Sequence, residues 1–398
     1  MLDLSKRARA ISPSPTLSID SKTKALVANG VDVINLSVGE PDFSTPDQAS
    51  LAAIAAITAH FTKYTAVNGI LELRQAIAQK LLEENQLHYS ANEIIVSTGA
   101  KQSLYNIFMT ILNPLDEVLL PTPYWVSYPE QIKLCDGIPV PLVTDESSSF
   151  KITPRQLEHA ITPKTKAILL NSPSNPTGAV YTKEEIAALA EVLAKYSIYV
   201  ISDEIYEQLT YDVPHVSIAQ IEAMRDRTFV VNGFSKTFAM TGWRVGYVAA
   251  PEHLIRAMSS LQSHTTANPS SISQKAALGA LGTFNPQTIN EYRKRRDYIV
   301  ASLNALDGME CVKPEGAFYI FPKAKGLIGR TLTLANGEKH TIETVDQLCE
   351  FLLVEAHVSV VSGSGFGAPD NFRISYATSL ANLEQAVARM EIFFSHLD

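Results

Sequence analysis

The sequence is poor in cysteine, in long apolar runs and in clusters of positive charge. Its three cysteines, Cys135, Cys311 and Cys349, have no metal-binding spacing and leave one unpaired, so we expect reduced packing residues in a cytosolic protein. The longest apolar run, "LAAIAAITA" at 51–59, is far shorter than the roughly 20 residues that span a bilayer. The net charge of −8 makes nucleic acid and anionic membranes poor candidates as partners.

The sequence does contain enough apolar material for more than one folded unit. Its 398 residues, 46% of them hydrophobic, predict two or three domains. Between residues 93 and 250, short β-rich runs alternate with helical patterns, as in a sheet covered by helices on both faces. A long helical stretch at 286–306 leads into strands and helices typical of a smaller α/β lobe.

We therefore predict an α/β fold divided into three parts. These are an N-terminal arm with part of the small domain at 1–45, a large cofactor-binding domain at 46–285 and a small C-terminal domain at 286–398. Within the last part, Asn336-Gly337 interrupts the alternating residues of 331–341, which predicts a surface hairpin with a two-residue turn.

Polar residues follow several of the predicted strands, at the edge of the sheet where ligands bind in such folds. "GAK" at 99–101 opens a helix whose exposed N–H groups suit a phosphate, although a glycine there also serves ordinary turn geometry. Asn175 follows the run "KAILLN" in a loop restricted by two prolines. Asp203 and Tyr206 follow "IYVIS", and a buried carboxylate needs either a basic side chain or a ligand's ring nitrogen as partner.

The segment "GFSKTFAMTGWRVGY" at 233–247 places Lys236 among small and apolar residues, with Arg244 eight residues later. In the ordinary case such a lysine packs its stem and keeps its charge in water, because an ammonium group is costly to bury. Together the strand ends offer a phosphate cradle, an amide, a carboxylate with a phenol, and a lysine with an arginine. Pyridoxal phosphate accounts for all of them, since it has a phosphate, a ring hydroxyl, a ring nitrogen and an aldehyde.

The order of these motifs resembles a known family. From "SVGEPDF" through "KYT", "STGAKQ", "PYWVSYPE", "NSPSNPTGAVY", "SDEIYE" and "GFSKTFAMTGWRVGY" to "FRISYATS", the sequence is similar to class I aminotransferases of the fold type I pyridoxal phosphate enzymes. It is most similar to the bacterial aspartate aminotransferases of subgroup Iβ, over nearly the whole chain. The resemblance implies a large domain with a mostly parallel seven-stranded sheet, a smaller α/β domain and a homodimer with shared active sites.

The resemblance also implies roles for the matching residues. Lys236 would form the Schiff base with pyridoxal 5'-phosphate and act as general base, Asp203 would pair with the ring nitrogen, and Tyr206 would bond the ring hydroxyl. The residues implied to bind the cofactor are Tyr64 from the partner subunit, Gly99, Ala100, Lys101, Trp125, Asn175, Asp203, Tyr206, Ser235, Lys236 and Arg244. Those implied to bind the substrate are Gly39, Lys101, Trp125, Asn175 and Arg373. No metal ligand is implied.

Several of these residues have an ordinary structural explanation when each is taken alone. Trp125 and Tyr64 could be packing aromatics, because such rings are often largely buried. Arg373, on an alternating strand, could be a solvated edge charge. Their joint occurrence in family order favours the functional interpretation, in which Arg373 holds the substrate α-carboxylate as a bidentate fork.

The predicted reaction moves the amino group of L-aspartate to 2-oxoglutarate by a ping-pong mechanism. The segment "LQSHTTA" lacks the arginine that reads the distal carboxylate in animal-type relatives, and Lys101 occupies the place of the lysine that replaces it in subgroup Iβ. Ser12 stands where a lysine is associated with prephenate activity, and Gly233 stands where the family usually has a phosphate-binding hydroxyl. Aromatic amino acid or prephenate transamination and a β-lyase reaction are the alternatives on the same fold.

A non-enzymatic alternative is a regulatory protein with an aminotransferase-like domain that binds pyridoxal phosphate. Such a protein needs a basic DNA-binding extension, and this acidic sequence has no basic recognition element. The N-terminal segment "MLDLSKRARAISPSP" has no apolar stretch after its basic residues, unlike a secretory signal. We therefore expect amino acid and 2-oxo acid substrates, no nucleic acid or membrane partner, and a cytoplasmic location.

Overall fold

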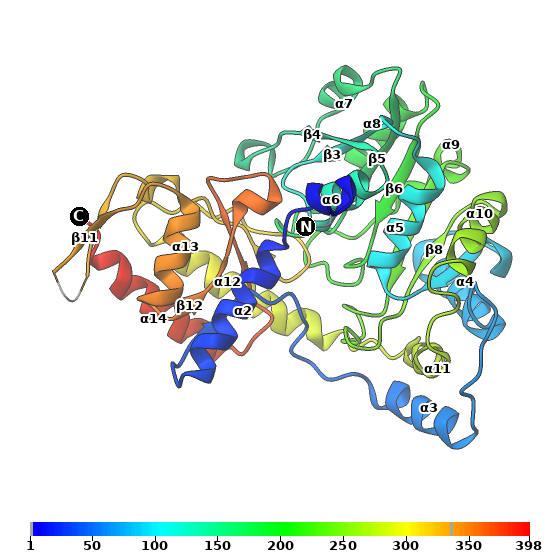
Figure 1. Cartoon of the computed structure of the whole chain (residues 1–398), viewed down its shortest axis with the longest axis horizontal. Helices are drawn as coiled ribbons and strands as arrows, with labels where there is room; N and C mark the ends of the chain where they lie inside the picture. Colours follow the sequence, from blue (N-terminus) through cyan, green and yellow to red (C-terminus); the bar gives the residue numbers. More distant parts are fainter. Residues whose placement is uncertain (1–2, 335–336) are drawn as a thin grey trace.

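A seven-stranded sheet forms the centre of the larger part of the molecule (Figure 1). The computed structural model describes residues 3–334 and 337–398. The strands lie in the order β2-β8-β7-β6-β5-β3-β4, and neighbours are parallel except that β8 runs antiparallel to β2 and β7. Their bounds are β2 Ile94–Ser97, β3 Glu117–Pro121, β4 Ile138–Leu142, β5 Thr165–Asn171, β6 Tyr199–Asp203, β7 Thr228–Gly233 and β8 Gly246–Ala249.

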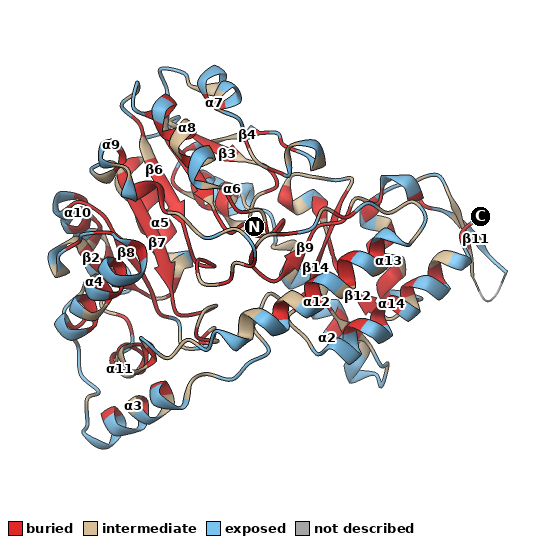
Figure 2. Ribbon diagram, turned by 180° about the vertical axis from the view of Figure 1, so that it is seen from behind, coloured by how far each residue is buried: buried red, intermediate tan, exposed pale blue. Residues whose placement is uncertain are grey.

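Helices cover both faces of this sheet, as the alternating pattern predicts. One face packs against α5, α6 and α10, and the other against α4 and α11 at one end and α7 and α8 at the other. Figure 2 shows the strands buried and the outer sides of the helices exposed. The helices are α3 Asp47–Thr58, α4 Leu71–Asn85, α5 Ala100–Ile111, α6 Ser127–Leu134, α7 Pro154–Ala160, α8 Lys183–Leu193, α9 Glu222–Arg225, α10 Glu252–Ser263 and α11 Ser271–Ala280.

Helix starts are encoded locally. At the start of α8, the Thr182 hydroxyl accepts a hydrogen bond from the Glu185 N–H, and the Glu185 carboxylate accepts one from the Thr182 N–H. This capping box satisfies two N–H groups that have no acceptor inside the helix. Thr153 and Gln156 form the same arrangement at α7, where Pro154 takes the first helical position.

A second group of smaller sheets lies beyond the long helix α12 (Figure 1). Strand β14 is the centre of a three-stranded antiparallel sheet with β13 and β9, and β1 near the N-terminus pairs in parallel with β12. The strands are β1 Ile34–Asn35, β9 Tyr319–Ile320, β10 Thr331–Thr333, β11 Lys339–Thr341, β12 Val358–Ser359, β13 Val361–Ser362 and β14 Phe372–Ser375. The helices are α1 Lys6–Ala10, α2 Pro15–Ala28, α12 Gln287–Asn304, α13 Val345–Val354 and α14 Leu380–Ser395.

Two features of the fold bear on the sequence predictions. Strands β10 and β11 pair antiparallel, as expected for a hairpin at 331–341, whereas Asn336 of its predicted turn lies outside the described residues. The edge strand β4, "IPVPL", is missing from the β-rich runs recognised in the sequence because Pro139 and Pro141 oppose a strand assignment. Proline is tolerated in an edge strand, where its missing N–H costs no hydrogen bond within the sheet.

The described residues contain no helix that is both long and apolar enough to cross a membrane. The cysteines Cys135, Cys311 and Cys349 are all buried and unpaired, in agreement with their predicted role as reduced packing residues. Burial raises the pKa of the Cys135 and Cys311 thiols to about 12, so neither is a reactive thiolate at neutral pH.

Candidate active site

The sheet brings the predicted strand-end residues to one edge. Strand β2 is parallel to β7, because both are antiparallel to β8, and β7, β6 and β5 are parallel to one another. In the register, Asn171 lies beside Asp203, while Ser97 and Gly233 both lie beside Gly246. The carboxyl ends of four strands therefore meet there, at the edge where α/β sheets bind ligands.

Lys236 lies at this edge, in the turn that follows β7. Its amine donates a hydrogen bond to the Gly39 carbonyl and lies 5.9 Å from the centre of the Tyr206 ring and 5.8 Å from that of Phe318. Burial, with a further contribution from the Arg373 charge, lowers the pKa of Lys236 to about 8. With this pKa roughly a tenth of the amine is neutral at pH 7, far more than for an ordinary lysine of pKa about 10.4, and a nucleophile or general base needs this neutral form.

Asp203 ends β6 with only 3% of its surface exposed. Its carboxylate accepts hydrogen bonds from the Tyr128 hydroxyl, at 2.7 Å, and from the Ile205 N–H, at 3.2 Å. Burial raises the pKa of Asp203 to about 6, although the Tyr128 hydrogen bond opposes that shift. No lysine or arginine forms an ion pair with this carboxylate in the part of the chain that the structure describes, so the basic partner expected of a purely structural aspartate is missing.

Arg373 enters the same space from β14. Its two terminal nitrogens donate to the Asn175 side-chain oxygen at 2.9 Å and to the Ser37 carbonyl at 2.7 Å. The guanidinium lies 4.6 Å from the centre of the Tyr319 ring, and its Nε is buried without a hydrogen-bond partner among the described residues. Arg373 is only 3% exposed, which rules out the solvated edge charge that the sequence left open.

Tyr206 and Gly39 complete this part of the site through Tyr319. The hydroxyls of Tyr206 and Tyr319 are 2.8 Å apart, and both side chains are buried. A Cβ on Gly39 would overlap the Tyr319 hydroxyl, so only glycine lets the chain pass here with its carbonyl facing Lys236. Tyr319 thus contacts a predicted cofactor residue and two predicted substrate residues.

The start of α5 forms a cradle for an anion. Gly99 precedes the helix with a φ of +81°, and a Cβ there would overlap the Arg244 guanidinium, so a side chain at this position is excluded on two grounds. The first N–H groups of α5, from Ala100 and Lys101, have no acceptor within the helix. Ser235, adjacent to Lys236, is the remaining member of the predicted phosphate set, and its side chain is largely buried.

Gly233 stands where a phosphate-binding hydroxyl is usual in the family that the sequence resembles. A Cβ at this position would lie 3.0 Å from the Gly246 Cα and 3.0 Å from the Val245 carbonyl oxygen. The close approach of β7 and β8 therefore leaves little room for a side chain, and Ser235 and Arg244 are the polar side chains that remain for this task.

Trp125 and Lys101 lie together, and Tyr64 does not reach them. The Lys101 amine is 4.8 Å from the centre of the Trp125 ring. Burial, with a smaller contribution from Arg244, lowers the pKa of Lys101. Tyr64 is 93% exposed, so it contributes to no site within its own subunit and its surface is free for another chain.

A cluster of potential metal ligands lies behind the site. Glu204, Glu207 and His215 place one ligand atom each within 4.8 Å of one another. The carboxylates already have protein partners, since Glu204 accepts from Ser202, Ser217 and His215, and Glu207 accepts from Lys80 and Asn85. Lys80 pairs with Glu207 and His215 with Glu204, so the cluster is built as an ion-pair network.

Two site residues escaped the sequence analysis. Tyr128 lies three positions after Trp125, one helical turn along, and this spacing within "YWVSYPE" was the available signal. Tyr319 lies in the apolar strand "GAFYIFP", where a buried tyrosine cannot be told from an ordinary core residue by pattern. The hydroxyl of each forms a hydrogen bond with a group from a distant part of the chain.

At the edge of a mostly parallel sheet, a buried lysine of lowered pKa lies near a carboxylate and an arginine that form no ion pair within the described residues. This combination defines an α/β enzyme of amine chemistry. Comparison with known proteins agrees. Residues 31–390 match the family described as aminotransferase class I and II, and the chain belongs to this family. Its α/β architecture is that of the fold type I transferases, with a seven-stranded sheet and a smaller α/β part.

Individual relatives are similar over almost their whole length. A protein named aspartate aminotransferase from Bacillus subtilis is 48% identical over 98% of this chain and 99% of its own. One named aspartate/prephenate aminotransferase from Cereibacter sphaeroides is 48% identical over 100% of both chains. The crystal structure of the aspartate aminotransferase from Rhizobium meliloti has a TM-score of 0.95 at 44% identity, covering 100% of both chains.

Proposed function

We propose that the protein is a pyridoxal 5'-phosphate-dependent aminotransferase that moves the amino group of L-aspartate to 2-oxoglutarate in a ping-pong reaction. Its family and the names of its relatives support the reaction class and the amino donor. The observation that carries the proposal is the position of Lys236, a buried amine of lowered pKa that has Arg373 and Asp203 as charged neighbours and no ion-pair partner among the described residues.

The residues at the sheet edge fit this cofactor. The absence of a side chain at Gly99 lets the Arg244 guanidinium pack against the start of α5, so that N–H groups and a positive charge suited to a phosphate lie together. Asp203 is a buried carboxylate without an ion-pair partner among the described residues. A protonated ring nitrogen would supply the missing positive charge. Tyr206 and Asn175 lie beside these groups and are assigned to the ring hydroxyl, with Trp125 assigned to the ring face.

When bound, pyridoxal phosphate supplies an aldehyde that takes up the amino group and a ring that accepts electrons released at the substrate Cα. Lys236, when free, holds and moves the proton at that carbon, a task that needs an amine of lowered pKa. Asp203, held by Tyr128, stabilises positive charge at the ring nitrogen. The apolar surroundings of Lys236 and Tyr206 exclude water and strengthen these charge interactions.

We assign the two carboxylates of the substrate to two basic residues. Arg373 is fixed by Asn175 and the Ser37 carbonyl, which leaves its Nε free to complete a fork for the α-carboxylate. Lys101 is assigned to the distal carboxylate, because its amine lies over Trp125 without an ion-pair partner in the described chain. We assign the backbone of Gly39 to contact with the substrate α-carboxylate.

The assembly and the domain division are part of the same proposal. Tyr64, at 93% exposure, is assigned to the phosphate of a partner subunit in a homodimer. The outward side chains of α3, Leu51, Ile54 and Ile57, are more than half exposed, and burial against a second subunit would remove this apolar surface from water. We keep the division at residues 45 and 285 and the cytoplasmic location as proposals.

The visible spectrum tests cofactor, linkage and substrate together. The purified protein should absorb in the visible range, lose that absorbance when L-aspartate is added and regain it with 2-oxoglutarate. Borohydride treatment should leave a pyridoxyl group on Lys236, detectable by peptide mass spectrometry. A coloured protein whose spectrum ignores L-aspartate would instead favour a cofactor-binding regulator.

Lys101 decides between aspartate and the alternative substrates. The kcat/KM values for aspartate, phenylalanine and cystathionine should be compared in the native protein and in Lys101→Ala. We expect the substitution to lower kcat/KM for aspartate about 10- to 100-fold more than that for phenylalanine, since only aspartate has a distal carboxylate. An equal loss for both would remove Lys101 from the specificity assignment.

A further inference from the structure

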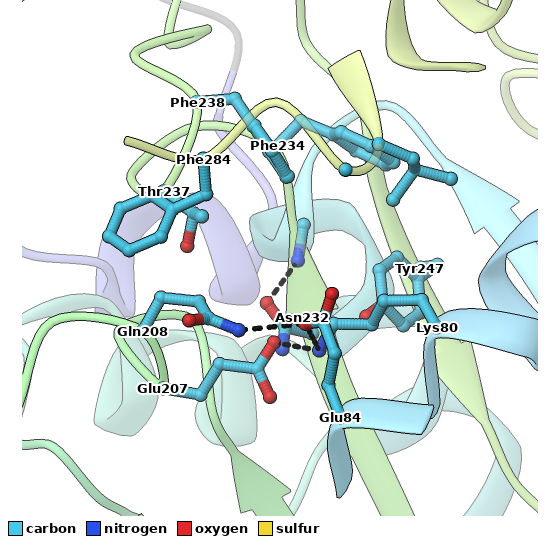
Figure 3. Close-up of a pocket in the computed structure, with 13 residues that line it drawn as sticks. Lys80, Glu84, Glu207, Gln208, Asn232, Phe234, Thr237, Phe238, Tyr247 and Phe284 are labelled. Atoms are coloured by element: carbon cyan, nitrogen blue, oxygen red, sulfur yellow. Dashed lines mark hydrogen bonds and ion pairs between the residues drawn. The ribbon is translucent and has the colours of Figure 1, made fainter. Parts of the chain in front are cut away.

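A separate cavity of about 420 Å³ lies beside the loop that carries Lys236 (Figure 3). It is bounded by α4, by the end of β7 with the following loop, and by the connection from α11 to α12. None of the residues that line it belongs to the set predicted to bind cofactor or substrate. Its volume falls within the range of roughly 300–1,000 Å³ that is usual for small-molecule sites.

The two sides of this cavity differ in chemistry. Figure 3 shows the rings of Phe234, Phe238 and Phe284 on one side, with the polar side chains opposite them. The polar side is made of Lys80, Glu84, Glu207, Gln208 and Asn232. Such a division suits a ligand with a flat apolar body and a polar head.

The polar side has an unbalanced negative charge. Lys80 forms ion pairs with Glu207 and, at 3.7 Å, with Glu84. His215 pairs with Glu204 and also acts on Glu207, so two basic groups serve three carboxylates. The Lys80 amine also donates to the Asn85 side-chain oxygen at 2.8 Å, which leaves it little capacity for an added anion. Burial raises the pKa of Tyr247, and the carboxylates of this region raise it further. The second contribution is the effect of a negative potential at the cavity.

Two hydrogen-bonding groups at the cavity have no partner among the described residues. Asn232 is 2% exposed, and its oxygen accepts from the Gly233 N–H at 2.7 Å. Its Nδ2 is buried without an acceptor among the described residues. The hydroxyl of Tyr247 likewise makes no hydrogen bond within residues 3–334 and 337–398. A buried amide donor is costly to leave unpaired, so an acceptor in the cavity would be stabilised here.

We propose that this cavity is a binding site for a small aromatic cation that carries a hydrogen-bond acceptor. The cationic group lies next to Glu84 and supplies the missing positive charge, while the ring packs among Phe234, Phe238 and Phe284. The acceptor takes a hydrogen bond from the Asn232 Nδ2. Aromatic side chains favour a cation in the same cavity through the negative face of their rings. An anion is disfavoured by the two carboxylates.

The probe is N,N-dimethyltyramine, titrated calorimetrically into the purified holoprotein. This molecule has an aromatic ring, a protonated amine and a hydroxyl acceptor, and as a tertiary amine it cannot condense with an aldehyde. Excess succinate keeps the candidate active site occupied throughout. The anionic probe 3-(4-hydroxyphenyl)propionate has the same ring and the opposite charge, and it is titrated under the same conditions.

Glu84→Gln and Glu83→Gln form a matched pair of variants. Both residues are exposed and lie on the same helix, but Glu84 lines the cavity whereas Glu83 bonds to Gln79. Each substitution therefore removes one exposed carboxylate, and only one of the two faces the ligand. We expect N,N-dimethyltyramine to bind one site per chain, about fivefold more weakly in Glu84→Gln and unchanged in Glu83→Gln. Phe284→Leu should weaken it about threefold through loss of ring contact.

Three outcomes would overturn the proposal. These are no binding of N,N-dimethyltyramine, equal affinities in Glu84→Gln and Glu83→Gln, and displacement of the probe by succinate, which would move it to the active site. Equal or tighter binding of the anionic probe would contradict the charge argument. A separate titration with succinate alone reports the active site, so failure of the two proposals can be told apart.

Discussion

The segment from Asp203 to Glu207 carries acidic side chains toward two regions that differ in what they bind. On the back of the sheet edge, Glu204 and Glu207 are buried and fully supplied with partners, among them His215 and Lys80. Although burial opposes it, the charges of Lys80 and His215 hold the pKa of Glu207 below its usual range. The two buried carboxylates of this network are therefore compensated by protein groups.

On the front of the same edge the charges are incomplete. Among the described residues, Asp203 has hydrogen-bond donors but no ion-pair partner, and Lys236 bonds a carbonyl but no anion. The buried Nε of Arg373 has no acceptor there either. The raised pKa of Asp203 and the lowered pKa of Lys236 both favour the neutral form of the group, whereas the lowered pKa of Glu207 favours its charged form. Burial alone therefore does not mark the functional residues; buried charge without compensation does.

The largest effect is expected for Lys236→Met, which removes the amine from the front region and keeps its volume. Aminotransferase activity should fall at least about 10⁴-fold, since both the covalent partner and the proton carrier are lost. The cofactor-free variant should be no less stable than the native protein. A variant with substantial residual turnover would remove Lys236 from the chemistry.

The pH dependence of the stability of Lys236→Met gives a second test of the same residue. The pKa of Lys236 is depressed from 10.5 to about 8 in the folded chain. The stability associated with this group is therefore present above its unfolded pKa and lost as pH falls through about 8. Thermal melts of cofactor-free protein should show the gain of stability in Lys236→Met near pH 7 and its disappearance above about pH 10.5.

The second largest effect is expected for Lys80→Met in the back region. Removing one partner leaves the Glu207 carboxylate buried without its cation, which costs about 3–5 kcal/mol of unfolding free energy. Urea denaturation measures this loss. The double variant Lys80→Met/Glu207→Gln should recover part of it, because no unpaired charge remains.

The exposed pair Lys195–Glu158 provides the control for this comparison. Lys195→Met removes the same charge from an ion pair that is more than two-fifths exposed on both sides, where water replaces the partner. Its urea midpoint should stay close to that of the native protein. If Lys80→Met left the urea midpoint equally unchanged, the back network would not stabilise the fold and its contrast with the front region would fail.

The sequence was sufficient to predict those residues of the front region that lie both at strand ends and in family motifs. Lys236, Asp203 and Arg373 were predicted from such positions, and the structure brings them into one buried space. The helix α12 and the parallel strands were recognisable because their hydrophobic periods are strong. Strand β4 was not, because its prolines are acceptable only at an edge, and edge position is a property of the assembled sheet.

The back network could not be predicted, for a physical reason. Lys80 lies on an amphipathic helix and Glu207 after a strand, 127 residues apart, and each alone has the pattern of a solvated charge. Their burial depends on how α4 packs against the sheet, which no local signal encodes. The same applies to Tyr128, whose partner Asp203 is 75 residues away.

A third effect is expected for Asp203→Asn, measured as stability of the cofactor-free protein. The folded pKa of Asp203 is raised from 3.8 to about 6, so its stabilising contribution is full below about 3.8 and lost as pH rises through about 6. The variant should therefore gain about 2–3 kcal/mol over the native protein above pH 6 and little at pH 4. Its activity should fall sharply.

Glu207→Gln is the matched substitution on the back of the same segment. Its depressed folded pKa means that its contribution is present above the unfolded pKa and lost as pH falls through the folded one. Glu207→Gln should therefore lose stability at neutral pH, where Asp203→Asn gains it. Changes of the same sign in both variants would contradict the division between compensated and uncompensated carboxylates.

The smallest effect is expected for Tyr128→Phe, which removes the one side-chain donor to Asp203 found among the described residues. A hydrogen bond to a charged group contributes about 1.5–3 kcal/mol, so kcat should fall about 10- to 100-fold while KM for aspartate changes little. The control is Tyr199→Phe, at the opposite end of β6, where no hydrogen bond of the hydroxyl is found in the described chain. Since Tyr128 acts on Asp203 and not on the substrate, a rise in KM without loss of kcat would show that its role lies elsewhere.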